Sequence, residues 1–346
     1  MNGKIFYFYG GYLPNSYEPT GNFLGNEWFR SFLINYGRKF LDSDQYDREF
    51  FLKKLLRKLK VNAVLAEYGP TAVHSLKICK ELGLPLIVHF HGFDAFYKPA
   101  IEENTIGYKK VFDYANAIIC VSEPMRDQLI SLGCSKRKLH KIRYCPHKNF
   151  YKLKPDYHSK NFVSVGRFVD KKAPYYLLLA FNKLLKHCPS STLTIIGDGP
   201  LFEVTKNIAS YLGIDKKIFL PGALDQQKVI KELGRACCYI QHSVTVSHGD
   251  QEGSPVAILE ALAAGLPVIS TRHAGIPEVI KHDDNGFLVD EHDVEDMSFY
   301  MQKIAKDFKI AEKIGSNAKK FAKKNFYPNP DIRDINNLIR ESVISN

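Results

Sequence analysis

Short runs of β-branched and other apolar residues alternate along the chain with longer amphipathic stretches. In the first part, this alternation predicts strands at 5–9, 63–67, 85–90, 117–121 and 141–144, and helices at 27–36, 48–60, 72–82 and 124–132. Apolar strands that alternate with helices are typical of a parallel sheet covered on both faces. The pattern therefore predicts an α/β fold.

A polar, aromatic and basic stretch at 146–160 lacks periodicity and is interpreted as a linker. The alternation then resumes, with strands predicted at 162–165, 193–196, 218–220, 238–241, 268–270 and 287–289, and helices at 174–187, 201–212, 225–233, 255–264, 294–305 and 331–343. We therefore predict two doubly wound, Rossmann-like domains in series, at 1–150 and 161–328. Ligands of such sheets bind beyond the carboxyl ends of the strands.

The composition is that of an ordinary globular protein, with 45% hydrophobic and 25% charged residues. No apolar run is long enough to span a bilayer, and the first residues lack a secretory leader. The seven cysteines form no Cys-x-x-Cys pair, so we expect reduced, buried thiols. These features favour a cytoplasmic location.

The net charge of +11 is unevenly placed, because residues 1–152 carry 23 Lys and Arg against 14 Asp and Glu. Such an excess favours an anionic partner: a membrane surface, a nucleic acid or a phosphorylated substrate. The stretch from Arg48 to Lys60 predicts a basic amphipathic helix. Its apolar face either lies on anionic lipid or packs on the sheet with solvated lysines outside.

The segment around residue 255 predicts a helix that begins at an anion site. Ser254 is a suitable N-cap and Pro255 a suitable first residue, so backbone N–H groups from Gly253 onward are free for a phosphate. Glu260 is charged within an apolar helix and needs a partner, either sugar hydroxyls or a basic side chain. Glu252 stands just ahead, beside the phosphate or as a solvated loop residue.

Two further loops follow predicted strands. Arg167 and Lys172 come after a strand that ends at Gly166, where they clamp a pyrophosphate or are simply solvated. Gly197 and Gly199 form a strand-to-helix turn that admits a phosphate or nucleoside, or is only a tight turn.

A polar cluster ends the strand at 85–90. His91 is a candidate donor to a sugar hydroxyl or phosphate, with a structural histidine as the alternative. A metal site of His89, His91 and Asp94 is a third reading of the same cluster.

These motifs together resemble those of the family 4 glycosyltransferases, which are retaining enzymes of the GT-B fold, and the resemblance covers nearly the whole chain. The matching elements are the two glutamates with seven residues between them, Glu252 and Glu260; Gly-Arg-(x)4-Lys at 166–172; Gly-Asp-Gly-Pro at 197–200; His-Gly-x-Asp at 91–94; and the segments 118–125, 275–280 and 285–289. The stretch 242–255 resembles members that build bacterial polysaccharide or lipid-linked glycans. The chain departs from the family pattern in the loop 10–26, at 144–147 and at 252–255.

The resemblance implies two domains that face each other across a cleft, with the acceptor side in 1–150 and the nucleotide-sugar site in 161–328. The helix at 331–346 would cross back to the first domain. The implied catalytic residues are His91, Arg167, Lys172 and Glu252. The implied donor-binding residues are Gly166, Arg167, Lys172, Gly197, Gly199, Glu252, Gly253, Ser254 and Glu260.

Individual roles follow from the same resemblance. Arg167 and Lys172 would hold the donor diphosphate, Glu260 the ribose hydroxyls and Glu252 the sugar hydroxyls. His91 would reach the donor sugar from the opposite domain. Cations around a departing diphosphate supply preorganised electrostatic stabilisation, so no metal and no resident cofactor are expected.

The function expected is transfer of a hexose, with retention, from a nucleotide diphosphate sugar to a hydroxyl of a lipid-linked or polysaccharide acceptor. We expect contact with an anionic membrane through 48–60, at the inner face of the plasma membrane, and no nucleic-acid partner. A nucleotide-sugar epimerase, a phosphorylase and a non-catalytic protein that binds an anionic glycan or membrane are the alternatives.

Overall fold

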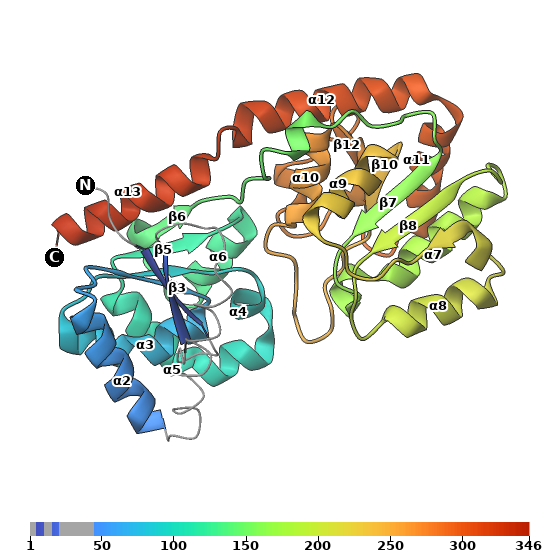
Figure 1. Ribbon diagram of the computed structural model, residues 1–346. Helices are drawn as coiled ribbons and strands as arrows, with labels where there is room; N and C mark the ends of the chain where they lie inside the picture. Colours follow the sequence, from blue (N-terminus) through green and yellow to red (C-terminus); the bar gives the residue numbers. More distant parts are fainter. Residues whose placement is uncertain (1–4, 10–15, 21–44, 346) are drawn as a thin grey trace, which may run out of the picture.

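The computed structural model describes residues 5–9, 16–20 and 45–345, and side chains from Glu49 onward except residue 51. Two parallel sheets, each covered by helices, form two domains that lie side by side and are spanned by the last two helices (Figure 1). This arrangement confirms the predicted fold class of two α/β domains built on parallel sheets.

The N-terminal sheet has the strand order β3-β4-β5-β6, with every neighbouring pair parallel. Its strands are β3 (Val64–Glu67), β4 (Leu86–His89), β5 (Ala117–Cys120) and β6 (Leu139–Lys141). The helices of this domain are α2 (Gln45–Lys58), α3 (Gly69–Leu82), α4 (Phe93–Phe96), α5 (Lys98–Tyr114) and α6 (Glu123–Ser131), with the 3-10 turn η1 (Lys136–Lys138).

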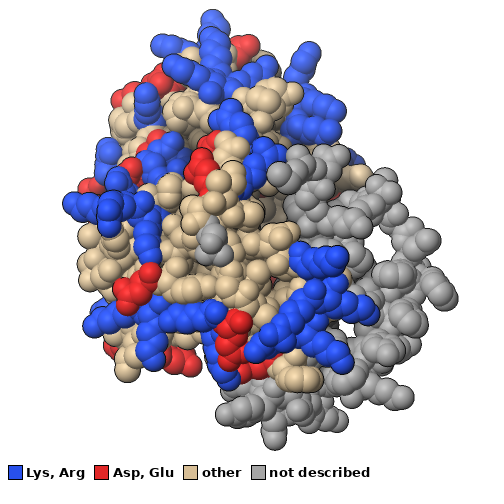
Figure 2. Space-filling model, turned by 90° about the vertical axis from the view of Figure 1, so that its left-hand side faces the viewer, with Lys and Arg blue, Asp and Glu red and all other residues tan. Residues whose placement is uncertain are grey.

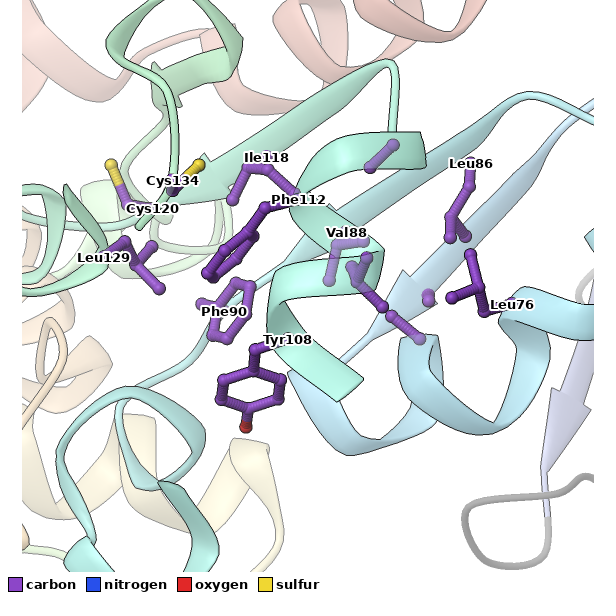
Figure 3. Close-up of a cluster of buried hydrophobic side chains, with 14 of the residues drawn as sticks. Leu76, Leu86, Val88, Phe90, Tyr108, Phe112, Ile118, Cys120, Leu129 and Cys134 are labelled. Carbon is purple, nitrogen blue, oxygen red and sulfur yellow. The ribbon is translucent and has the colours of Figure 1, made fainter. Parts of the chain in front are cut away.

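The core of this domain gathers between β4, β5 and helices α3 and α5. Phe90 packs edge-on against Tyr108, with ring centroids 5.5 Å apart, and Phe112 lies against both rings (Figure 3). A side chain at Gly69 would come within 2.6 Å of the Phe90 ring, so the first turn of α3 needs glycine there. This packing fixes the end of β4, from which the polar cluster emerges.

The C-terminal sheet has the order β12-β11-β10-β7-β8-β9. Its strands are β7 (Asn161–Val165), β8 (Thr192–Ile196), β9 (Ile218–Phe219), β10 (Cys238–Gln241), β11 (Val268–Thr271) and β12 (Gly286–Val289). Its helices are α7 (Pro174–Leu185), α8 (Phe202–Tyr211), α9 (Gln226–Gly234), α10 (Val256–Ala264) and α11 (Val294–Lys306), with 3-10 turns η2 (Phe150–Lys152), η3 (Asp170–Lys172), η4 (Asp215–Lys217) and η5 (Ile276–Glu278).

The last two helices connect the domains. Helix α12 (Phe308–Phe326) packs on α10, and α13 (Pro330–Ile344) lies over the N-terminal sheet (Figure 1). Leu338 of α13 shares a buried cluster with Ile87 of β4 and Ile119 of β5. The side chain of Asp331 accepts a hydrogen bond from the backbone N–H of Cys145 at 3.1 Å.

The first predicted strand is present at β1 (Ile5–Tyr9), but its expected place in a parallel sheet is wrong. β1 pairs antiparallel with β2 (Ser16–Thr20), a strand that the pattern did not predict, in a separate two-stranded sheet. Parallel neighbours need a crossover of about a dozen residues, and β2 follows too soon for one. The predicted helix 27–36 lies outside the described residues.

Two long helices were not predicted. Helix α12 buries mostly small side chains, including Ala311, Ala318 and Ala322, whose weak apolar signal is lost among lysines. Helix α5 does carry a readable signal, because Pro99 stands in its first turn and buried positions recur from Ala100 to Phe112. The strand expected at 141–144 lies earlier in the chain, because β6 spans Leu139–Lys141.

Candidate active site

The two domains touch where the His-Gly-x-Asp segment of one meets the Glu-Gly-Ser-Pro segment of the other. A Cβ on Gly253 would lie 2.3 Å from the carbonyl oxygen of His91, and one on Gly92 would lie 3.0 Å from the amide nitrogen of Gly253. Gly92 has φ +133°, a conformation that side chains rarely adopt. Glycines at both positions therefore let the two backbones meet directly.

Polar contacts on either side of this point join the same two domains. The backbone N–H of Lys98 donates to the carbonyl oxygen of His248 at 3.0 Å. Glu278 accepts from Arg143 at 2.7 Å and from the backbone N–H of Glu123 at 2.6 Å, and Lys141 lies 3.1 Å away. The motif at 275–280 thus provides an interdomain ion cluster.

On the C-terminal side, Lys172 and Glu252 come together. Lys172 Nζ lies 3.2 Å from Glu252 Oε1, and both side chains are largely buried. Burial alone would raise the pKa of Glu252, but the neighbouring ammonium groups of Lys172 and Lys171 outweigh it and lower that pKa. Glu252 is therefore a buried carboxylate, held as an anion by cations.

Lys171, which the sequence analysis did not single out, organises the loop that carries Glu252. Its buried ammonium group donates to Asp250 Oδ1 at 2.9 Å and to the carbonyl oxygen of Gln251 at 3.0 Å. The carbonyl oxygen of Lys171 accepts from the N–H of Val244 at 3.0 Å. One lysine of the pair thus holds the loop while the other faces Glu252.

A second unpredicted pair fixes the backbone of Glu252 from the other side. The N–H of Glu252 donates to Nε2 of His273 at 3.1 Å, and Nδ1 of His273 lies 2.6 Å from Glu291 Oε1. Because Nε2 accepts, the proton of the neutral ring is on Nδ1 and is donated to Glu291. His273 is 1% exposed, so its ring is shielded from water, whereas Glu291 is partly exposed.

Glu260 belongs to helix α10 and takes no part in these ion pairs. Burial raises the pKa of its carboxyl to about 7, and no hydrogen bond or ion pair to it occurs in the described part of the chain. A half-buried carboxylate without a protein partner is suited to accept hydrogen bonds from a ligand. This matches the environment in which the resemblance expects ribose hydroxyls.

Arg167 is exposed at the carboxyl end of β7, where a small pocket is lined by Gly166, Arg167, Lys172 and Gln241 among others. Burial raises the pKa of Tyr68 in the N-terminal domain, and the charge of Arg167 opposes that shift. The structure therefore brings Arg167 and Lys172 to one pocket, and the charge of Arg167 is near enough to affect a side chain of the other domain.

Gly197 and Gly199 let the turn at 197–200 pack closely against the loop beside this pocket. A Cβ on Gly197 would lie 1.9 Å from the carbonyl oxygen of Gly166, and one on Gly199 would lie 2.6 Å from that of Phe168. Both have strongly positive φ. Their visible structural role is close packing of the 197–200 turn on the loop that carries Arg167.

The expected start of α10 is one residue too early. Pro255 is the N-cap, the helix begins at Val256, and the buried Ser254 makes no capping hydrogen bond. Proline has fixed φ but no side-chain acceptor, so the amides of the first turn lack a side-chain cap. Gly253 and Ser254 lie just ahead of this helix start, between Glu252 and the N-terminal domain.

On the N-terminal side, the ring of His91 is held at both nitrogens. Nε2 lies 2.5 Å from Glu67 Oε2, and Nδ1 is hydrogen-bonded to the hydroxyl of Tyr144. His89 Nδ1 lies 3.2 Å from the same Glu67 oxygen. Burial would raise the pKa of Glu67, but the hydrogen bonds to His89 and His91 lower it to about 2.

The metal set of His89, His91 and Asp94 is not assembled, so that reading was wrong in its third member. The fully buried carboxylate of Asp94 instead accepts backbone N–H groups of Gly69, His91 and Gly92 at 2.9–3.0 Å. Asp94 therefore shapes the turn that carries His91. The side chain beside the histidines is Glu67, which lies on the neighbouring strand β3 and belongs to no motif in the sequence.

Two parallel-sheet α/β domains that meet beside a pocket of cations and a buried carboxylate have the architecture of the GT-B fold. The chain belongs to the family described as "Glycosyl transferases group 1", whose model matches residues 147–321. The model described as "Glycosyltransferase Family 4" matches residues 23–143. These matches confirm the resemblance drawn from the motifs.

Curated relatives agree with this assignment. The chain is 30% identical over 69% of its length to the amylovoran biosynthesis glycosyltransferase AmsK of Erwinia amylovora. It is 28% identical over 68% of its length to WcaL of Escherichia coli, a putative colanic acid biosynthesis glycosyltransferase. The chain spans 59% of the length of each.

Solved structures share the fold at low identity. HepE of Anabaena, solved in complex with UDP, has a TM-score of 0.72 at 19% identity, with 87% of this chain and 82% of that chain covered. Sucrose-phosphate synthase of Thermosynechococcus elongatus has a TM-score of 0.72 at 16% identity, with 85% and 77% covered. HepE has also been solved with UDP-glucose.

Proposed function

We propose that this protein is a retaining, metal-independent hexosyltransferase of polysaccharide or lipid-linked glycan synthesis, with a nucleotide diphosphate sugar as its donor. The observation that carries the proposal is the pocket at the end of β7, where Lys172 and Arg167 stand beside the buried Glu252. Two cations and one carboxylate match a substrate with a diphosphate and a hydroxyl-rich sugar.

Each side chain has a distinct task in this proposal. Arg167 is exposed and free to engage a diphosphate, whereas Lys172 is shared between the diphosphate and Glu252. As the glycosidic bond breaks, these cations stabilise the charge that develops on the departing diphosphate. Glu252 accepts hydrogen bonds from the donor sugar, Glu260 from the ribose, and His91 contacts the sugar from the opposite domain.

The acceptor side of the proposal rests on the N-terminal domain. Helix α2 buries Leu52 and Leu56 in the core of this domain and packs against α3. Its opposite face keeps Lys54, Arg57 and Lys58 exposed, and Phe50 is 70% exposed. Lys and Arg side chains are spread over this end of the molecule (Figure 2).

We propose that this face approaches the anionic inner surface of the plasma membrane, where a lipid-linked or polysaccharide acceptor presents its hydroxyl. Each basic residue near such a surface contributes roughly 1 kcal/mol. No described helix combines the length and the apolar character needed to cross a bilayer. The protein in this proposal is cytoplasmic and peripheral.

Donor panels test the function. The purified protein is incubated with UDP-, GDP- and ADP-sugars, first for thermal stabilisation and then for nucleotide release with and without candidate glycan acceptors. We expect one donor to stabilise the fold, by roughly 2.7 kcal/mol at a hundred times its Kd. Acceptor-dependent nucleotide release with an unchanged anomeric configuration would support retaining transfer.

The alternatives give other products. A changed sugar without an acceptor indicates an epimerase, and a sugar phosphate formed from inorganic phosphate indicates a phosphorylase. Binding of glycan or vesicles without turnover of any donor indicates a non-catalytic protein.

The substitution Arg167→Ala gives the sharpest test of the pocket. Arg167 is exposed, so its removal should leave the fold intact while kcat/KM falls at least about 30-fold, equivalent to about 2 kcal/mol of transition-state stabilisation. Lys172→Ala should lose more and also destabilise the protein, because it leaves the buried Glu252 without its closest cation. Lys216→Ala, an exposed lysine of η4, is the matched control. Activity of the Arg167 variant equal to that of the control would contradict the assignment.

A further inference from the structure

Three side chains at the carboxyl ends of β3 and β4 converge beside the cleft. Glu67 and His89 are register partners on these parallel strands, and His91 follows two residues after His89. One ligand atom from each of Glu67, His89 and His91 lies within 4.8 Å of the other two. Among the described residues, this is the cluster of three such side chains close enough to share one ion.

We propose that Glu67, His89 and His91 form a binding site for a zinc-class transition-metal ion, and that the bound ion inhibits sugar transfer. Two imidazole nitrogens and one carboxylate oxygen are a ligand set that Zn²⁺ prefers, and three protein ligands leave the fourth position open. The side chain of Glu67 is 52% exposed, so an ion has access from solvent.

The two separations from the Glu67 oxygen are close to those of a zinc site. Ligand atoms of a tetrahedral zinc site lie about 3.3 Å apart, given metal–ligand bonds of about 2.0–2.1 Å. Glu67 Oε2 already lies 3.2 Å from His89 Nδ1. Its separation from His91 Nε2 must open from 2.5 Å to about 3.3 Å, which an ion between them would enforce.

The surroundings of the His91 ring fit metal ligation. Zinc-ligating histidines donate their other N–H to an oxygen, and Nδ1 of His91 faces the hydroxyl of Tyr144. His89 is 5% exposed, and its Nε2 has no hydrogen-bond partner among the described residues. A metal bond at Nδ1 leaves the ring proton on Nε2, so the bound state requires a water molecule as the acceptor of that N–H.

Inhibition rests on the proposed function, in which His91 contacts the donor sugar. An ion on Nε2 would hold the His91 ring against Glu67 and place a positive charge beside the cleft. The ion therefore competes with the productive position of His91 and is no part of the transfer reaction.

Metal binding is tested without any substrate. The metal-free protein is titrated with ZnCl₂ by calorimetry, and with Co²⁺ by visible absorption, which reports tetrahedral coordination. We expect one ion per chain with micromolar or tighter affinity. Glu67→Gln and His89→Asn should each weaken binding by at least about 100-fold, whereas His158→Asn, an exposed histidine elsewhere, should not.

Circular dichroism verifies that each variant is folded, and the half-exposed Glu67 provides a reliable variant if the buried His89 does not tolerate change. The absence of stoichiometric binding, or binding by both variants as tight as that of the parent, would overturn the site. This result does not depend on whether the protein transfers a sugar, so the two proposals fail separately.

Activity measurements then test the inhibitory effect. Zn²⁺ at saturating concentration should lower transfer at least tenfold, and EDTA should restore it without lowering the activity of untreated enzyme. His89→Asn should keep its transfer activity and resist zinc. If zinc binds at this cluster while transfer is unchanged, the inhibitory role is wrong; if EDTA abolishes transfer, the ion is required rather than inhibitory.

Discussion

At the scale of single residues, the cleft contains carboxylates whose environments differ sharply. Glu252 is anionic because lysines neighbour it, whereas Glu260 meets no described partner and has a pKa raised to about 7 by burial. Asp94 is buried without a countercharge and is satisfied by backbone N–H groups instead. Of these three, only Glu260 can bind a ligand without first breaking a contact with another described residue.

Glu260 should impose a pH dependence on stability. Its folded pKa of about 7 exceeds the ordinary value of 4.5, so the folded state binds more protons than the unfolded state between these values. Its contribution is therefore full below about pH 4.5 and is lost as pH rises through about 7. Glu260→Gln should remove up to about 3 kcal/mol of the change in unfolding free energy between pH 4.5 and pH 7.

Urea unfolding at pH 5, 6, 7 and 8, as illustrative points in the window set by this linkage, measures the effect. Glu103→Gln, an exposed glutamate of α5, is the control and should keep the slope of the parent. If the unfolding free energy of Glu260→Gln changes with pH as much as that of the parent, another group titrates in this range.

At the scale of elements, the site is a set of loops at strand ends, each fixed by contacts with a neighbouring segment. The turn at 197–200 supports the β7 loop, Lys171 holds the loop before Glu252, and the His273–Glu291 relay fixes its backbone. The strands provide rigid platforms, and the supporting residues orient the side chains that face the cleft.

The relay predicts a separation of nucleotide binding from turnover. His273→Ala removes the acceptor of the Glu252 N–H, so Glu252 should lose its orientation toward the sugar and kcat/KM should fall about 10–100-fold. The Kd for the free nucleotide diphosphate should stay within about twofold, because the pocket of Arg167 and Lys172 is intact.

His273→Gln, whose amide oxygen accepts the same N–H, should recover part of the activity. Equal losses in nucleotide binding and turnover, with no recovery by glutamine, would assign His273 a purely structural role.

At the scale of the whole molecule, the domains are joined by close backbone contact, by α13 and by the ion cluster at Glu278. The basic excess lies in residues 1–152, and Lys and Arg side chains are spread over the face of the molecule seen in Figure 2.

Glu278→Gln should loosen the domains. The side chain of Glu278 accepts from Arg143 and from the N–H of Glu123, and it lies beside Lys141. Removal of its charge should cost about 1–3 kcal/mol of interdomain stability. We expect a larger radius of gyration by small-angle scattering and faster amide exchange at Glu123; an unchanged scattering profile would show that α13 and the glycine contact suffice.

Membrane contact should depend on the exposed face of α2. Lys53 pairs with Glu81, so the free cations are Lys54, Arg57, Lys58 and Lys60. Their replacement by Gln should weaken sedimentation with anionic liposomes at low salt, and high salt should weaken that of the parent. Binding to neutral liposomes should be weak throughout.

The matched control for this test removes four exposed lysines of α12: Lys309, Lys313, Lys320 and Lys324. If both quadruple variants lose vesicle binding equally, net charge rather than the α2 face drives it. Donor-induced thermal stabilisation should be the same in the parent and both variants.

The chain by itself determined the two doubly wound domains, because strands buried on both faces and amphipathic helices write their periods directly into the sequence. The motifs likewise selected Glu252, Glu260, Arg167, Lys172 and His91 as candidate site residues. Tertiary structure alone decided which of these meet: Lys172 reaches Glu252, while Glu260 is left without a described partner.

The supporting residues were also beyond reach of the sequence. Glu67, His273 and Glu291 act across strands and loops far apart in the chain, and their spacing carries no periodic signal. The pairing of β1 with β2 and the place of Asp94 were misjudged for the same reason. Hydrophobic periodicity specifies which face of an element is buried, but polar contacts depend on the register between elements, which only the folded chain defines.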